Sequence, residues 1–558
     1  MVYGGKPSRG CRTCRARRIK CDEGKPTCQR CAKSKRECGG YRPEFDVVHR
    51  DQTNSTLRRV NNKIETTTKV ESTSSAPSPS PSPTAVLTVP LAQRATCYFA
   101  SNFILMPLSS TAAHGFMDYL VPLIGSEPQG SSLRHAFNAC AFALLSNRAK
   151  ADAVDLSQFS LREHTLALAQ TYKALGHPAT AAADATLAAV LLLSLYETIT
   201  ARKETRMLAW RSHIDGAVRI VQTRGRDMCK TRTGALLFAA VRHQLISRTL
   251  SSGIPLPLGT DWWMSDGHSD TLLAAAQRFA LNCGDIKTQS GQILVSCSKS
   301  PESIDKVRKE IQRVQDLDRS IANWLASISK EFRFAPFCWV YEDDLGLSKG
   351  GSYAEVDVFP GRVDVYPDFV TASAWNLARV TRLLLASIHI RLVAWICAPA
   401  GYRDTPEYSA ARTICEATIS DILASVPYHF GWHLNRGIGS YSDISGFACG
   451  EEAGGLKALP AFFLIWSLTC VKNHDITTPQ QRAWAKGRLR VISEQVGLKY
   501  AQVVNDVDLR FPSMMIHQDG ISIASDPFYR TLPVRSAASP DSPLTPDSIP
   551  PIKKSPSP

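Results

Sequence analysis

Six cysteines within the first forty residues constrain the fold of this chain more than any other feature. Each half of the segment has the spacing C-x2-C-x6-C, and the second half repeats the first seventeen residues later. Cysteines at this density, next to arginines and lysines, indicate a metal cluster on a surface that binds nucleic acid. The six are Cys11, Cys14, Cys21, Cys28, Cys31 and Cys38.

The number of cysteines predicts how the metal is held. A structural zinc ion takes four ligands, so one zinc would leave two thiolates unused and two zincs need eight ligand positions. Six cysteines fill eight positions only if two of them bridge both ions. The repeat suggests Cys11 and Cys28, which open the two halves, as the bridging pair. Apart from Ile19 the segment has almost no apolar core. Metal binding must therefore supply the folding free energy, on the order of 10 kcal/mol or more.

A disulfide framework and an iron–sulfur cluster are the alternatives to zinc. Disulfides need an oxidising compartment, and no signal peptide is recognisable at the start of the chain. Iron–sulfur clusters usually have tighter or different cysteine spacing. The spacing therefore favours two Zn²⁺ ions bound by all six cysteines.

Basic residues are concentrated around the cysteines. Residues 1–50 hold fourteen Lys and Arg against five Asp and Glu, a net charge of +9, while the whole chain carries +15. Because the basicity is local, it indicates a nucleic-acid-binding face rather than a generally cationic protein. The run Lys33-Ser34-Lys35-Arg36 could also serve in nuclear import.

The run from Cys14 to Asp22, followed by Pro26-x-Cys28-x-x-Cys31, resembles the fungal Zn2Cys6 binuclear-cluster transcription factors. The resemblance covers roughly residues 10–40. It implies two zinc ions that share two bridging cysteines. It also implies a basic segment that enters the major groove of double-stranded DNA at a CGG-type triplet.

The same resemblance implies roles for four basic residues. Arg17 and Arg18 would read bases, and Arg15 and Lys20 would contact phosphates. The family often has Lys at the reading positions, where this chain has Arg. Arginine can donate two hydrogen bonds to O6 and N7 of guanine, which suits a G-rich site.

A segment rich in Ser, Thr and Pro follows, from Thr53 to about Pro90, and it predicts a disordered linker. Only Leu57, Val60 and Ile64 have coiled-coil spacing there, barely one heptad, so no stable coiled coil is expected. From Arg535 the tail has a similar composition and contains Ser-Pro and Thr-Pro dipeptides that kinases could modify.

Between these segments, from about Leu91 to Asp508, apolar residues recur at helical spacing and predict an all-α domain. The stretch Tyr353–Tyr366 is the main candidate for strand structure. Three arginines in Ala372–Cys397, the longest apolar helix, argue against a membrane span. The helical patterns cover Ser132–Arg148, Leu161–Leu175, Asp184–Ala201, Arg206–Arg224, Gly234–Leu250, Ser303–Ile328, Ala372–Cys397, Glu407–Val426, Gly455–Val471 and Pro479–Val504.

Segments of this domain are also similar to the fungal-specific region that accompanies many Zn2Cys6 modules. They are Leu191–Glu197, Trp210–Ala217, Cys449–Lys457 and Pro460–Trp466. The similarity implies a regulatory helical domain and not an enzyme. Glu197 and His213 are expected to be buried side chains with structural contacts rather than catalytic groups. No catalytic motif is recognisable, and His429 with His433 is an improbable zinc site because Gly431 intervenes and no Glu accompanies them.

We therefore predict a Zn2Cys6 module in residues 1–45, a linker in 46–92, an all-α regulatory domain in 93–508 and a mostly disordered tail in 509–558. The predicted function is that of a nuclear, sequence-specific regulator of RNA polymerase II transcription in a fungus, with CGG-type half-sites and a homodimer formed through the helical domain. The alternative is an interaction or signalling protein whose helical domain is the main functional part and whose DNA binding is weak.

Overall fold

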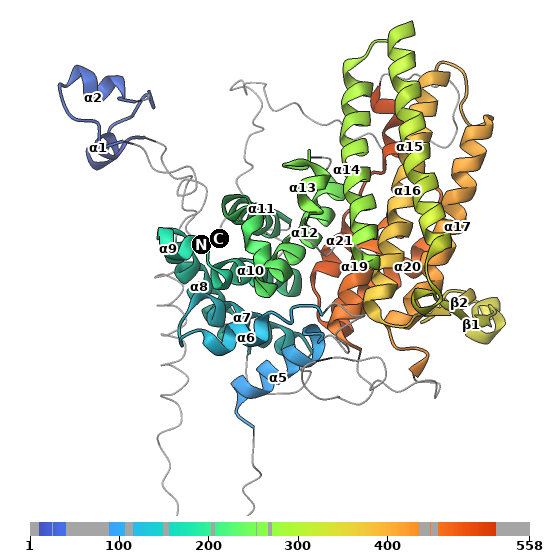
Figure 1. The fold of residues 1–558 in the computed structure, drawn as a ribbon, viewed down its shortest axis with the longest axis horizontal. Coiled ribbons are helices and arrows are strands. Elements are labelled where there is room, and N and C mark those ends of the chain that lie inside the picture. The colour runs from blue at the N-terminus through green and yellow to red at the C-terminus, as the bar shows by residue number, and fades with distance from the viewer. Residues whose placement is uncertain are drawn as a thin grey trace, which may run out of the picture.

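The computed structural model describes residues 10–24, 26–40, 89–106, 115–148, 156–201, 207–252, 254–265, 271–434, 447 and 456–519. The predicted linker up to residue 88, its partial heptad and the Ser/Thr-Pro tail lie outside these residues. Two short helices, α1 (Arg12–Ala16) and α2 (Gln29–Lys33), form the N-terminal module, which Figure 1 shows apart from the large helical domain.

The first half of the helical domain is built on α10 (Asp184–Thr200), which is buried along nearly its whole length. It packs against α7 (Ser132–Arg148), α8 (Leu156–Leu175) and α11 (Met207–Arg224). Because all faces of α10 are apolar, it must be enclosed by other helices. The remaining helices here are α5 (Leu91–Phe103), α6 (Leu120–Ser126), α9 (Pro178–Ala181), α12 (Arg232–Ser252) and α13 (Gly259–Trp263).

The second half is organised around α16 (Phe369–Cys397). Helices α14 (Leu272–Ser296), α15 (Pro301–Ser327) and α17 (Pro406–His429) lie alongside it, as Figure 1 shows. The chain then forms α19 (Ala458–Asn473), α20 (Pro479–Val491) and α21 (Tyr500–Asp506). The two halves share one continuous apolar core.

Helix α16 is long and apolar enough to cross a membrane by length and composition, but 78% of its most apolar window is buried inside the protein. Its arginines also have partners within the fold. Arg379 donates to the hydroxyl of Tyr366 at 2.6 Å, and Arg382 pairs with Asp318 at 2.7 Å. These contacts are those of a core helix.

A two-stranded antiparallel sheet, β1 (Ala335–Val340) and β2 (Gly361–Val365), projects beside the long helices. Strand structure within the ambiguous stretch Tyr353–Tyr366 is thus limited to its last few residues. Strand β1 was not predicted, because its residues alternate only weakly between buried and exposed positions and a bulge follows Pro336.

The helical predictions need correction, since α5, α6, α9, α13 and α14 were not among them. Helix α14 was missed because Gly284 and Gly291 interrupt its apolar pattern. Gly284 is required by packing, since a Cβ there would lie 2.5 Å from Cγ2 of Thr249. The predicted helix Pro479–Val504 is instead broken by a π-helical turn at Ile492–Val496 and by Gly497, whose φ is +88°.

The helical domain also extends past the predicted boundary at residue 508. A 3-10 helix, η7 (Pro512–Asp519), packs on α16. The hydroxyls of Ser513 and Ser387 are 2.8 Å apart. Arg391 and Asp519 form a buried two-point ion pair, with Nε to Oδ2 at 2.7 Å. Hydrogen bonds and ion pairs of this kind leave no periodic pattern in the sequence, so the sequence did not predict that this segment packs on α16.

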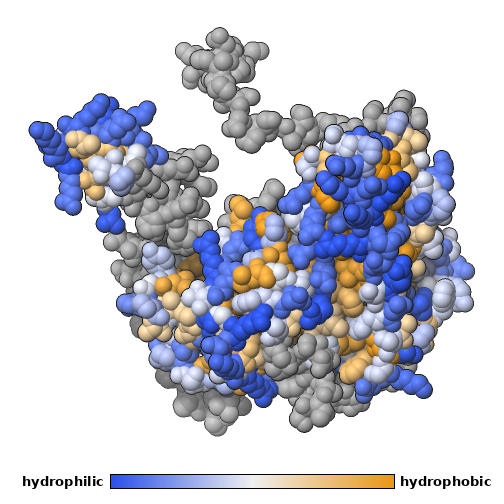
Figure 2. Space-filling view, turned by 45° about the horizontal axis from the view of Figure 1, so that its top comes forward, coloured by the Kyte–Doolittle hydropathy of each residue, from blue (hydrophilic) through white to orange (hydrophobic). Residues whose placement is uncertain are grey.

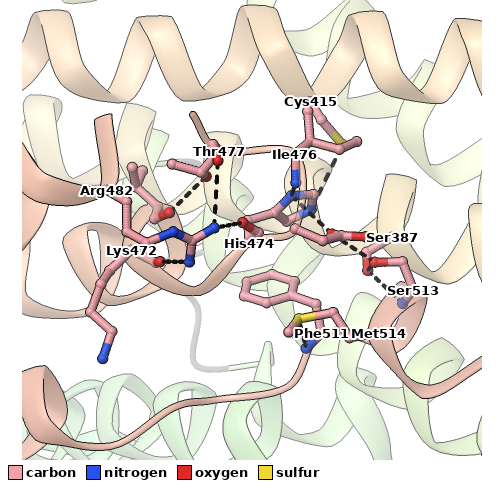
Figure 3. Close-up of polar contacts among 12 residues, drawn as sticks. Ser387, Cys415, Lys472, His474, Ile476, Thr477, Arg482, Phe511, Ser513 and Met514 are labelled. Carbon is pink, nitrogen blue, oxygen red and sulfur yellow. Dashed lines mark hydrogen bonds and ion pairs between the residues drawn. The ribbon is translucent and has the colours of Figure 1, made fainter. Parts of the chain in front are cut away.

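Buried polar groups of α19 and of the segment after it are satisfied within the fold, and Figure 3 shows the contacts around His474 and Arg482. The ammonium of Lys472 donates to the carbonyls of Val504, Asn505 and Val507 at 2.7–3.1 Å. Burial lowers the pKa of His474 to about 4. The ring is therefore neutral, and its Nδ1 accepts a hydrogen bond from the backbone of Ile476 at 3.2 Å. This network joins α19 to α21 and the residue after it, and it has a structural role.

We expect Asp519→Ala to lower the free energy of unfolding by about 3–5 kcal/mol, because it leaves Arg391 buried without its carboxylate. Asp305→Ala is the matched control, since Asp305 pairs with Arg308 on the surface of α15. It should cost no more than about 1 kcal/mol. Urea unfolding followed by circular dichroism measures both, and equal effects would show that η7 does not anchor the domain.

Candidate metal centre and nucleic-acid interface

The two halves of the N-terminal module have the same local structure. Cys11 is the N-cap of α1, and its sulfur accepts the N–H of Cys14 at 3.3 Å. Cys28 caps α2 in the same way, and its sulfur accepts the N–H of Cys31 at 3.3 Å. Each helix thus begins at the first cysteine of a C-x2-C pair and contains the second, with an early amide facing a cluster sulfur.

Both helices also end alike. The residues after them, Arg18 and Lys35, have left-handed φ values of 54° and 50°. This conformation lets the next N–H bond back to a cysteine carbonyl: Ile19 to Cys14 and Arg36 to Cys31, each at 3.1 Å. The seventeen-residue repeat in sequence is therefore a repeat in backbone conformation.

The sulfurs lie in two overlapping groups of four. One group is Cys11, Cys14, Cys21 and Cys28, and the other is Cys11, Cys28, Cys31 and Cys38. Within each group all ligand atoms lie within 4.8 Å of one another. Cys11 and Cys28 are the two members that both groups share, and their sulfurs are 3.8 Å apart. The geometry thus brings together all six predicted ligands in the arrangement that a doubly bridged cluster requires.

The sulfur spacing fits tetrahedral zinc. Sulfurs about 2.3 Å from a zinc ion at tetrahedral corners lie about 3.8 Å from one another. The Cys11–Cys31 and Cys14–Cys28 pairs are 3.8 and 3.7 Å apart. Desolvation raises the pKa of the Cys14 and Cys31 thiols, the latter to about 12, so a cation is needed to hold the cluster as thiolates. Within the described residues, these two cysteine groups are the sets of metal-ligating side chains that could hold an ion.

Two residues that position the module were missed from the sequence. Asp22 accepts hydrogen bonds from the backbone of Gln29 at 3.0 Å and of Arg30 at 3.3 Å, and the first of these lowers its pKa. Thr13 joins the first half to the last residues, donating to the carbonyl of Glu37 and accepting from Gly39. Neither pairing is visible from sequence, because each joins residues at least seven positions apart.

The predicted DNA contacts lie beside the cluster but not on one helix. Arg17 is the C-cap of α1, Arg18 forms the left-handed turn, and Lys20 follows in extended chain. These three are exposed, whereas Arg15 on α1 is half-buried. The face of the module visible in Figure 2 is mostly hydrophilic. The module therefore presents a cationic, solvent-accessible edge.

The polar residues considered for other roles in the helical domain have structural contacts. His164 lies 3.7 Å from Glu197 and stacks on Tyr196 with ring centroids 4.0 Å apart. His429 contacts the carbonyl of Ser425 at 3.1 Å, and His433 stacks on Tyr428. Burial lowers the pKa of His429 to about 4, so it is neutral.

Comparison with known protein families identifies the class of protein. Residues 9–46 match the fungal Zn(2)-Cys(6) binuclear cluster domain, and residues 96–324 match the fungal specific transcription factor domain. The fold and site are thus those of a zinc-cluster DNA-binding module joined to a helical regulatory domain. The chain belongs to the fungal Zn2Cys6 transcription factors, and its N-terminal domain binds two zinc ions.

One relative matches along most of the chain. Transcription factor dbaG of Emericella nidulans is 23% identical over 411 residues, which are 74% of this chain and 90% of that protein. Others match over the zinc module. The aspercryptin biosynthesis cluster-specific transcription regulator atnN of the same organism is 54% identical over 39 residues, 7% of this chain and 6% of its own. Moc3, a transcriptional regulatory protein of Schizosaccharomyces pombe, is 69% identical over 32 residues, 6% of each chain. No solved structure matches significantly.

We expect the fragment of residues 1–50 to bind two zinc ions and to be unfolded without them. Cys11→Ala should lose both ions, because it removes a ligand from each sulfur group. Cys14→Ala is the matched control: it leaves the group with Cys31 and Cys38 complete and should retain about one ion. Native mass spectrometry gives the stoichiometry. One zinc in the unmutated fragment, or equal losses in the two variants, would contradict the bridged cluster.

Proposed function

We propose that this protein is a nuclear, sequence-specific regulator of RNA polymerase II transcription that reads CGG-type triplets through its zinc cluster. The observation that carries the proposal is the exposed basic turn of Arg17 and Arg18 directly after a helix whose N-cap is a cluster cysteine. All six cysteines are proposed as zinc ligands, with Cys11 and Cys28 bridging. The cluster thereby fixes the backbone from which the two arginines extend.

Arg18 is the proposed principal reader of guanine. Its backbone is held in the left-handed conformation by the return bond from Ile19 to Cys14. Holding the backbone lowers the entropy cost of presenting the guanidinium, which can then donate to O6 and N7 of one guanine. Arg15 and Lys20 flank this turn and are proposed to contact phosphates.

The helical domain is proposed to regulate the activity of the protein and to form its homodimer. The family consists of regulators and not enzymes, and we propose the same of this chain. The name of the aspercryptin regulator suggests control of one pathway or gene cluster. That relative matches over the zinc module, so the similarity supports how DNA is read rather than which genes are controlled.

A comparison of Arg18→Ala with Lys20→Ala tests the division between base reader and phosphate contact. Alanine at position 18 keeps a Cβ and so leaves the backbone strain unchanged. Arg18→Ala should cost about 1–3 kcal/mol on a CGG duplex and little on a random one. Lys20→Ala should weaken both duplexes alike and reduce the salt dependence by about one phosphate contact.

Fluorescence anisotropy titrations at several salt concentrations measure these changes. Identical behaviour of the two variants on both duplexes would refute the assigned roles. Strong binding of the helical domain to a protein partner, with no preference for CGG over random DNA, would favour the alternative that DNA binding is secondary.

We also expect residues 1–90 to sediment as a monomer and the full chain as a dimer. The linker holds barely one heptad, whereas three or more are needed for a stable coiled coil. A single small module gives limited affinity for DNA, and a dimer could bind a second half-site. Sedimentation equilibrium distinguishes the cases: a dimeric fragment would place the interface in the linker, and a monomeric full chain would contradict pairing through the helical domain.

A further inference from the structure

The two halves of the zinc module contact each other reciprocally. The segment after the third cysteine of the first half lies at the start of α2, where the carboxylate of Asp22 accepts the N–H of Gln29 at 3.0 Å. The segment after the third cysteine of the second half lies at the start of α1, where the carbonyl of Gly40 accepts the N–H of Arg12 at 2.9 Å. Arg12 and Gln29 are equivalent positions of the seventeen-residue repeat. Reciprocal contacts of this kind join units that are related by an approximate two-fold axis.

This symmetry gives the module two edges with the same backbone conformation. We call residues 15–20, which include the turn after α1, the first edge, and residues 32–37, which include the turn after α2, the second edge. Arg18 in the first edge has a φ of 54°, and Lys35 in the second has a φ of 50°. Both residues are exposed, and in both turns the next N–H returns to a cysteine carbonyl at 3.1 Å. A DNA groove that accepts the backbone of one edge could therefore accept that of the other.

The side chains make the two edges different. Lys35 places a cation at the position equivalent to Arg18, and lysine can also donate to guanine. The position equivalent to Lys20, the proposed phosphate contact, is occupied by Glu37. Glu37 is exposed, and its backbone carbonyl accepts the hydroxyl of Thr13 at 3.1 Å, which fixes its place on the module. If the second edge entered the groove, this carboxylate would meet a DNA phosphate and repel it.

Net charge alone does not keep the second edge away from DNA. Residues 15–20 hold four Lys and Arg, a net charge of +4, and residues 32–37 hold three against one Glu, a net charge of +2. Both edges would therefore be attracted to phosphates. Two residues of the second edge, Ala32 and Ser34, are neutral where the first edge has arginine, and they only weaken this attraction. Glu37 instead opposes it at a single position.

We propose that Glu37 sets the orientation in which the module docks on DNA, because it keeps the second edge off the phosphate backbone. The first edge alone then enters the major groove, and each half-site is read in one direction. Repulsion that rejects one of two competing binding modes is a general source of specificity. The inference rests on the proposed function, since it takes Arg18 as the base reader and Lys20 as a phosphate contact.

The test uses the full zinc-loaded chain and fluorescence anisotropy titrations with a CGG duplex. Lys20→Glu should weaken binding about tenfold or more, because a phosphate contact becomes a repulsion. Adding Glu37→Lys should recover about fivefold or more, since the second edge then has a lysine at the phosphate position. Adding Glu23→Lys instead is the matched control: it restores the same net charge at an exposed residue outside both edges and should recover no more than about twofold.

A second measurement separates a reversed orientation from local compensation of charge. In the chain with Lys20→Glu and Glu37→Lys, Lys35→Ala should weaken CGG binding more than Arg18→Ala does. The wild-type chain should show the opposite order. Native mass spectrometry should find two zinc ions in every variant, because all the substituted side chains are exposed.

The proposal is overturned if the Glu37→Lys and Glu23→Lys additions bind DNA alike. It is also overturned if Arg18→Ala remains the more damaging change in the chain with exchanged charges. In both cases the weakening by Lys20→Glu would leave the proposed function standing. A Lys20→Glu chain that binds the CGG duplex as tightly as the wild type would instead contradict the proposed role of Lys20 and this inference together.

Discussion

The conformation of the N-terminal module depends on having fewer cysteine ligands than two separate zinc ions would need. Two tetrahedral zinc ions need eight sulfur positions and the chain supplies six, so two sulfurs must serve both ions. Cys11 and Cys28, the proposed bridging pair, belong to both sulfur groups, and each is also the N-cap of a helix. The turns that follow the helices are closed on the carbonyls of Cys14 and Cys31, so cysteines hold both ends of each helix. With almost no apolar core, the segment depends on metal binding for its folding free energy.

The helical domain is stabilised in a different way. Its core is continuous across both halves and is organised on α10 and α16, which are buried along most of their length. Several charges within this core are paired by the fold: Lys472 donates to three carbonyls, and Arg391 pairs with Asp519. Such groups join segments that apolar packing alone would leave undefined.

The sequence alone determined the zinc cluster and the helical class of the large domain, and it predicted the six ligands with Cys11 and Cys28 as the bridging pair. Ligand spacing and helical periodicity act over a few residues, so they are visible in a linear chain. Only the tertiary structure decided the capping by Asp22, the presence of α14 despite its glycines, the break at Gly497 and the anchoring of η7. These features join residues from distant positions, and their energies depend on packing that no local pattern records.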